Sequence, residues 1–291
     1  MKKWQPLLAA VLLLAPLAPL PSIVPLAPAS AHAAVLNDTI KESTRPAGDS
    51  YNIAEGRSLK APVRWLIVED HRTEAYDADG KLVAYSSYPT LRVKGEGHAA
   101  LSRALAAWNK KQAPDPTKDF SSAYRHSKED RERRGHQFST YSDYSLITEW
   151  GRVDDRVVSF CLYNTAYLGG AHPMHGRKGT TFDVSTGKEV RLAQIVTSRE
   201  ALLQTLAAAF HAQYPAKREG ELFEKDIKKQ LEKRHPAKEG LDSFSWYMGT
   251  RGELVFLYQP YALAPYASGD FKLTIERTDA PQLFTKAYPL K

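Results

Sequence analysis

The chain has 291 residues, one cysteine and a formal net charge of +7. Without Lys2 and Lys3, 38 basic residues (40 − 2) face 33 acidic ones, a net charge of +5. This mild excess is a poor argument for a nucleic-acid partner, and we expect none; it suits weak attraction to anionic cell-wall polymers or membrane surfaces. Because Cys161 is the only cysteine, no internal disulfide can form, and an apolar core must supply the stability.

Residues 1–33 have the pattern of a secretory signal peptide. Lys2 and Lys3 precede the apolar run LLAAVLLLA, and small residues follow toward Ala34. The alternative is an uncleaved membrane anchor, which four prolines between residues 16 and 25 oppose because each removes a helical hydrogen bond. We therefore expect cleavage near Ala31–Ala34 and export to the periplasm or the medium, with no transmembrane segment afterwards.

The first half of the remaining chain predicts a leader, two strands, two helices and two more strands. Residues 34–62 are polar and without period, which predicts a flexible leader. Two β-rich runs then flank the turn Asp77-Ala78-Asp79-Gly80. Apolar residues at helical spacing predict a helix over 97–112, and a second helix is expected over 120–134. YSDYSLITEW and RVVSFCLYNTAYL predict a hairpin, with Asp154 and Asp155 as turn residues and Cys161 as a buried, inert thiol.

The second half repeats this order. TTFDV and KEVRL flank a turn at Ser185-Thr186-Gly187, and Ser198 is an expected N-cap for a helix that Pro215 ends. ELFEKDIKKQLEKR predicts another helix with Leu222, Phe223, Ile227 and Leu231 on its core-facing side. SFSWYM, ELVFLYQ and DFKLTIER predict three strands.

Tight turns between neighbouring strands predict an α+β fold of antiparallel sheets with helices packed on them, in two similar-sized α/β subdomains. The expected organisation is a signal peptide (1–33), a flexible leader (34–62), an N-terminal α+β domain (63–172) and a C-terminal α+β domain (173–291).

The stretch YLGGAHPMH is the main candidate for a functional site. It supplies Tyr167, Gly169, Gly170, His172 and His175. Two histidines could bind a metal, but zinc needs three or four ligands, and only Asp183 or His211 could be suggested as a third. His172 could act as a general base, yet no nucleophile is recognisable. In the simplest reading the two glycines only turn the chain. We assign no catalytic residue, cofactor or metal, and retain a binding loop as the hypothesis.

The loop QPYALAPYASG is the second candidate. Tyr258, Tyr261 and Tyr266 could form a platform for a sugar ring or a protein, or could pack beneath their own loop. Because both stretches lie at strand ends, we expect them to converge, with His172, Tyr261 and Tyr266 on one concave surface.

Three segments carry a resemblance: YLGGAHP, TTFDVSTGKEVRLAQIV and ELVFLYQPYALAPYASGDFKLTI. They resemble the exported bacterial DUF4163/DUF3298 domain family, in which a GGAH loop, a D-x-x-T-G-K hairpin and a Y-x-x-A-P-Y-A-x-G segment recur. The half before the GGAH loop, with YPTLRV and the helix that contains Trp108 and Asn109, resembles the DUF4163 domain. That domain is also found beside the catalytic domain of a peptidoglycan deacetylase. A similar pair of domains forms the extracytoplasmic, lysozyme-binding part of an anti-sigma factor that also has a transmembrane helix and a cytoplasmic segment; this chain shows neither.

The resemblance implies a non-catalytic binding module of the cell envelope, with a lysozyme-like hydrolase or peptidoglycan as partner. It implies that three groups of residues shape the signature loops: Gly169, Gly170, Ala171 and His172; Asp183, Thr186, Gly187 and Lys188; and Tyr261, Ala264, Pro265, Tyr266 and Gly269. The alternative is a cell-wall hydrolase or deacetylase that uses His172 and His175.

Overall fold

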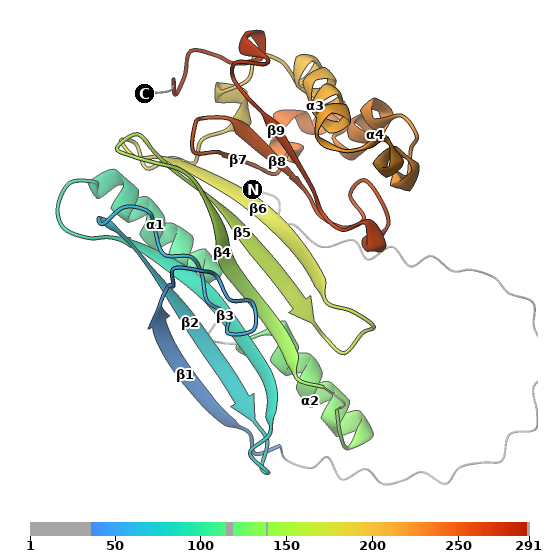
Figure 1. Ribbon diagram of the computed structural model, residues 1–291. Helices are drawn as coiled ribbons and strands as arrows, with labels where there is room; N and C mark the ends of the chain where they lie inside the picture. The colour runs from blue at the N-terminus through green and yellow to red at the C-terminus, as the bar shows by residue number, and fades with distance from the viewer. Residues whose placement is uncertain (1–35, 115–118, 138, 290–291) are drawn as a thin grey trace, which may run out of the picture. The chain divides into compact units, whose positions relative to one another are not determined.

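The computed structural model describes residues 36–114, 119–137 and 139–289. The predicted signal peptide and its cleavage region lie outside these residues. The described part has a six-stranded sheet and a three-stranded sheet with helices against them, as Figure 1 shows. The predicted α+β class is therefore confirmed. None of the helices in the described ranges has the length and apolar character needed to cross a bilayer.

The large sheet has the strand order β1-β2-β3-β4-β5-β6 (Figure 1). Its neighbouring strands pair antiparallel, as predicted, except that β3 and β4 run parallel. Between these two strands the chain forms α1 (Ala99–Gln112) and α2 (Ser122–Arg134), and such a crossover is what a parallel pair requires. The strands are β1 (Thr39–Pro46), β2 (Leu66–Tyr76), β3 (Leu82–Val93), β4 (Tyr141–Val153), β5 (Val157–Tyr167) and β6 (Met174–Asp183).

Strand β1 lies inside the segment that the sequence predicts to be a flexible leader. It pairs with β2 from Thr39 to Pro46, although nearly all of its residues are exposed. Further along, the Ser58 amide and hydroxyl donate to the two carboxylate oxygens of Asp70, at 2.7 and 2.5 Å. From residue 39 onward the expected leader is thus a paired strand and an anchored loop. The sequence pattern does not reveal strand β1, because an edge strand that is held by backbone hydrogen bonds does not need alternating apolar side chains.

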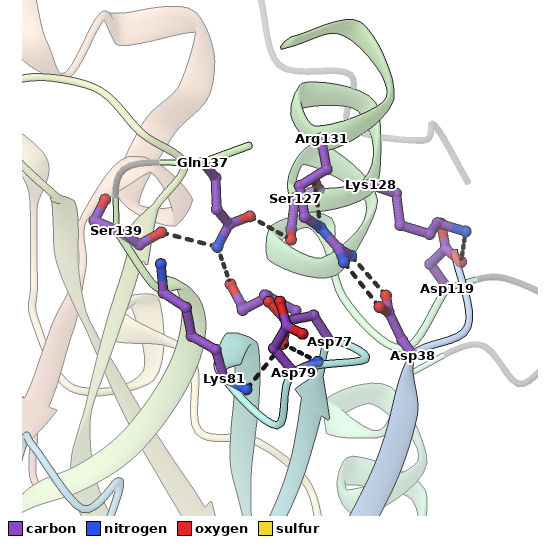
Figure 2. Close-up of polar contacts among 11 residues, drawn as sticks. Asp38, Asp77, Asp79, Lys81, Asp119, Ser127, Lys128, Arg131, Gln137 and Ser139 are labelled. Carbon is purple, nitrogen blue, oxygen red and sulfur yellow. Dashed lines mark hydrogen bonds and ion pairs between the residues drawn. The ribbon is translucent and has the colours of Figure 1, made fainter. Parts of the chain in front are cut away.

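The turn and cap predictions are confirmed. Asp77 Oδ1 accepts from the amides of Asp79 and Lys81 (Figure 2). Gly80 in the same turn has a φ of 75°. Asp154 Oδ1 likewise accepts two amides in the β4–β5 turn. The Ser198 hydroxyl accepts from the Ala201 amide and starts α3 (Arg199–Gln213).

Helix α4 is shorter than the sequence predicts. It spans only Ile227–Arg234, because Asp226 caps it by accepting from the amides of Lys228 and Lys229. Phe223 therefore lies outside the helix with 53% of its surface exposed, so its predicted core position is wrong. Its amide donates to Leu263 O instead, which places it beside the β8–β9 connection.

The small sheet contains the three predicted C-terminal strands. They are β7 (Trp246–Met248), β8 (Leu254–Tyr258) and β9 (Phe271–Ile275). Leu202, Leu206 and Phe210 of α3 form one core cluster with the inner side chains of β8 and β9. The boundary expected between residues 172 and 173 falls just before β6, which pairs with β5, so the segment assigned to the C-terminal domain gives a strand to the large sheet.

Strand β7 lies directly against the large sheet. A Cβ on Gly151 would come within 1.9 Å of Met248 O, and one on Gly179 within 1.9 Å of Trp246 O. Only glycine permits this approach of two backbones. Cys161, fully buried as predicted, packs here with three side chains of β7 and β8: Tyr247, Val255 and Leu257.

Candidate functional site

Two loops from different sheets meet at one place. The GGAH loop (residues 168–173) connects β5 to β6, and the Tyr loop (residues 259–270) connects β8 to β9. The rings of His172 and Tyr266 stack with centroids 3.9 Å apart and an interplanar angle of 23°. The Tyr266 hydroxyl also donates to Pro173 O at 2.8 Å. The expected convergence of the two loops is therefore present.

Tyr261 is the exposed aromatic side chain of this junction. Its ring centroid lies 5.8 Å from that of Tyr266, and 52% of its surface is exposed. Its φ is +66°, a left-handed conformation that residues other than glycine seldom adopt. A hydrogen bond from its amide to Ala264 O, 3.0 Å long, holds this conformation. Such strain often accompanies function and here presents the ring to solvent.

Beside this stack lies a charged cluster that joins the two sheets. Asp270 accepts from His175 Nε2 at 3.1 Å through one oxygen and from Arg177 Nε at 3.0 Å through the other. The His175 ring also packs edge-on against Tyr266, with centroids 5.8 Å apart. His175 thus has two contacts with the Tyr loop, one polar and one aromatic.

Glu149 of β4 extends the charged cluster. Its carboxylate accepts hydrogen bonds from the Tyr247 hydroxyl at 2.8 Å and from Lys272 Nζ at 2.9 Å. Arg177 Nη1 lies 3.5 Å from the other carboxylate oxygen. Burial alone would raise the pKa of the Glu149 carboxyl, but the hydrogen bonds from Lys272 and Tyr247 outweigh it and lower this pKa. Glu149 is therefore ionised at neutral pH and neutralises the nearby cations.

A cavity of about 430 Å³ opens beside His175. It is open, and its lining combines Met174 with the polar or charged side chains of Asn164, His175, Arg177, Lys178 and Gln259. His172, Tyr261 and Tyr266 do not line it, although Tyr266 contacts His175. The three aromatic residues thus form an outward surface beside this cavity rather than one shared pocket.

The other predicted site residues lie elsewhere or have structural roles. Tyr167 packs edge-on against Tyr141, with centroids 6.1 Å apart. Gly169 has a φ of 87°, and a Cβ there would lie 2.2 Å from the Tyr141 hydroxyl. Gly170 has neither constraint. Tyr258 is only 3% exposed and lies in the core, so it cannot contribute to an exposed binding surface.

The residues suggested for metal binding are also structural or distant. Within residues 36–114, 119–137 and 139–289, no three His, Cys, Asp or Glu side chains are grouped to hold a metal ion. Asp183 Oδ1 instead accepts from the Ser185 hydroxyl and from the amide and hydroxyl of Thr186, which closes the turn after β6. A Cβ on Gly187 in this turn would lie 2.3 Å from Ala100 O. The D-x-x-T-G-K motif therefore fixes a turn against α1.

Sequence reasoning missed Asp270, Arg177, Glu149 and Met174. Asp270 lies 95 positions from His175 and 93 from Arg177, so no local motif links them. The available signal was weaker: a carboxylate and a glycine at the end of the Tyr loop, just before β9.

Comparison with known families identifies part of the chain. Residues 195–278 match the family described as "Protein of unknown function (DUF3298)". The matched DUF3298 segment contains the Tyr loop with Asp270, but it begins after the GGAH loop and does not include it. It covers less than a third of the chain. The comparison with curated proteins gives no match.

Two solved structures of DUF3298 family proteins are similar to this chain. The protein from Pseudomonas aeruginosa PAO1 shares 16% identity over 89% of this chain and 99% of its own, with a TM-score of 0.48. The member from Bacteroides fragilis NCTC 9343 shares 15% identity over 87% of this chain and 95% of its own, with a TM-score of 0.51. At this identity, the likeness to the Bacteroides protein shows a shared fold alone.

Proposed function

We propose that the chain is an exported, non-catalytic binding module of the cell envelope that recognises a protein through its two-loop surface. We define the two-loop surface as His172, Met174, Tyr261 and Tyr266. The observation that carries the proposal is the His172–Tyr266 stack, which joins loops from both sheets and sets the exposed Tyr261 ring beside it. A rigid junction of this kind presents side chains with little ordering cost on binding.

Exposed apolar side chains gather on or beside these loops. Seven large hydrophobic side chains are exposed among the described residues. Three of them, Leu168, Met174 and Tyr261, belong to the loops or border them, with exposures of 37, 54 and 52%. A fourth, Phe223, is tied by its amide to Leu263 O of the Tyr loop. Exposed clusters of Tyr, Met and Phe are typical of protein interfaces.

The resemblance to lysozyme-binding extracytoplasmic domains makes a lysozyme-like hydrolase the favoured partner. An outward surface of apolar and aromatic side chains suits a folded protein better than a single glycan strand, which would use a groove. Peptidoglycan is the other outcome of the test.

A cell-wall enzyme using His172 and His175 has less support. His172 hydrogen-bonds to Pro173 O, and His175 hydrogen-bonds to Asp270, so neither ring is hydrogen-bonded to a hydroxyl or thiol nucleophile of the described residues. Burial raises the pKa of the Cys161 thiol to about 11, which keeps it protonated and unreactive.

The test compares binding by the purified chain with binding by Tyr261→Ala. A lysozyme immobilised on a sensor and insoluble peptidoglycan in a sedimentation assay are the two probes. We expect lysozyme binding that Tyr261→Ala weakens about tenfold or more, as for a central interface tyrosine. The matched control is Tyr51→Ala, which removes a tyrosine of similar exposure, 44%, from the β1–β2 connection and should leave binding unchanged.

Three results would count against the proposal. The first is that the protein binds neither probe, and the second is that Tyr51→Ala weakens binding as much as Tyr261→Ala does. The third is the release of peptidoglycan fragments in an activity that His175→Ala abolishes, which would establish the enzyme instead.

Export is tested separately. N-terminal sequencing of material from the producing cell should begin between His32 and Val35, and an intact Met1 in the membrane fraction would contradict export.

A further inference from the structure

A second cavity lies away from the two-loop surface, where β4 meets the turn between β7 and β8. Its volume is about 550 Å³, within the range of small-molecule sites. Its lining includes Trp150, Arg152 and Val153 of β4, and Thr250 and Arg251 of the turn. The lining thus combines the apolar residues Trp150, Val153 and Pro62 with two arginines and one acidic residue, Asp154.

Arg152 is a buried charge with an unsatisfied nitrogen. Only 5% of the residue is exposed. Its Nε donates to Asp154 Oδ2 and its Nη1 to Pro289 O, each at 2.8 Å. Its Nη2 is buried and has no hydrogen-bond partner among the described residues. Nη2 carries two N–H donors, and leaving donors of a buried charge unmet costs free energy that a bound acceptor would recover.

The surrounding charge is favourable for an anion. Asp154 is the one carboxylate paired with Arg152 in the described part of the chain. Close by, Arg277 donates only to backbone carbonyls there, among them those of Gly252 and Ala287. Burial and the charge of Arg152 lower the pKa of the Arg277 guanidinium, which reflects the excess of positive charge around Arg152.

We propose that this cavity binds a small organic carboxylate with an apolar body. The guanidinium of Arg251, whose side chain is 70% exposed, is the first donor to the carboxylate. Arg152 Nη2, which has almost no accessible surface in the free protein, becomes the second donor when the side chains that cover it shift on binding. Trp150 and Val153 contact the apolar part. Arg251 already pairs with Glu276, so the ligand competes with Glu276 for this exposed arginine, and an exposed ion pair costs little to break.

The test is an NMR titration of ¹⁵N-labelled protein. The indole N–H of Trp150, assigned with Trp150→Phe, reports on the cavity because Trp150 lines it. Sodium benzoate, acetate and phosphate are each compared with sodium chloride at equal ionic strength. We expect a saturable shift with benzoate and weaker binding of acetate, which lacks the apolar body. Tighter binding of phosphate than of benzoate would overturn the assignment of the ligand, and no saturable shift beyond chloride would overturn the site.

Variants identify the donors. Arg251→Ala should weaken benzoate binding about tenfold through loss of a charge-assisted hydrogen bond. Arg152→Lys keeps the charge but loses the second terminal nitrogen, so it should weaken benzoate binding at least as much as Arg251→Ala does. Arg156→Ala is the matched control, because this exposed arginine of the β4–β5 turn does not line the cavity. Equal weakening by Arg156→Ala would show general charge attraction and overturn the proposal. If Arg152→Lys does not fold, the wild-type titration and Arg251→Ala still decide.

Discussion

Asp38 and Arg131, 93 positions apart in the sequence, form a bidentate ion pair with two hydrogen bonds. Arg131 Nη1 donates to Asp38 Oδ1 at 2.8 Å, and Nη2 donates to Oδ2 at 2.6 Å (Figure 2). The two side chains are 2% and 8% exposed. The bond from Arg131 lowers the pKa of the Asp38 carboxyl, which keeps it ionised. This pair ties the residue just before β1 to helix α2, and so it holds the edge of the large sheet.

Asp38→Asn should therefore destabilise the protein strongly. Removing one partner leaves the Arg131 charge buried and uncompensated, so we expect the free energy of unfolding to fall by about 3–5 kcal/mol in urea denaturation. Asp49→Asn is the control, because Asp49 and its partner Lys60 are 87% and 63% exposed and should contribute about 0–1 kcal/mol. Similar losses in the two variants would contradict the importance of the buried pair.

Cys161 should be inert in the folded protein. The residue has no exposed surface, and burial raises the pKa of its thiol to about 11, so both access and thiolate are lacking. We expect a thiol reagent at pH 8 to react at least about a hundredfold faster in denaturant than in buffer, because the native state must first open. Equal rates would show that the space between the two sheets is accessible to the reagent.

Much of the fold could be predicted because its signals are local. The turn at Asp77, the cap at Ser198 and the apolar spacing of the α1 helix are each encoded within a few residues. Strand β1 could not be found in this way, since its side chains bury almost nothing and its partner β2 begins 20 residues after it ends. The parallel β3–β4 pair likewise depends on a crossover of two helices, which leaves no local mark in either strand.

The candidate site could be predicted only in outline. Gly169 and the Pro-rich Tyr loop mark strand ends, which is why their convergence with His172 could be expected. The burial of Tyr258 could not, because whether a tyrosine at a strand end faces the core or solvent depends on the helix packed over it. Asp270 escaped notice for a similar reason, since its partners lie on β6, across the space between the two sheets.

His235 should make stability depend on pH. Its side chain is buried and stacks on Phe244 with centroids 3.7 Å apart. Burial, with the charges of Arg234 and Arg199, lowers the pKa of its imidazole to about 3. Because the unfolded value is about 6.5, the neutral ring contributes stability that is complete above pH 6.5 and is lost as pH falls toward 3, by up to about 1.4 kcal/mol per pH unit. His235→Gln removes this titration, so its urea midpoint should fall less than that of the wild type between about pH 6.5 and pH 4. Parallel curves for the two proteins would show that His235 is not buried as a neutral ring.

The two glycines of the GGAH loop should differ sharply in their tolerance of a side chain. Gly169 has a φ of +87°, and a Cβ there would lie 2.2 Å from the Tyr141 hydroxyl, which is part of a packed ring. Gly169→Ala combines left-handed strain with overpacking, so it should lower the free energy of unfolding by about 2–4 kcal/mol.

Gly170→Ala is the matched control: a Cβ there would meet nothing closer than His172 O at 3.9 Å, and its φ is not in the left-handed region. We expect a change within about 0.5 kcal/mol for Gly170→Ala by urea denaturation. If Gly170→Ala keeps this stability yet loses binding to the immobilised lysozyme, the second glycine belongs to the interface; if both variants are equally destabilised, the conformation of the loop in solution differs from the one described.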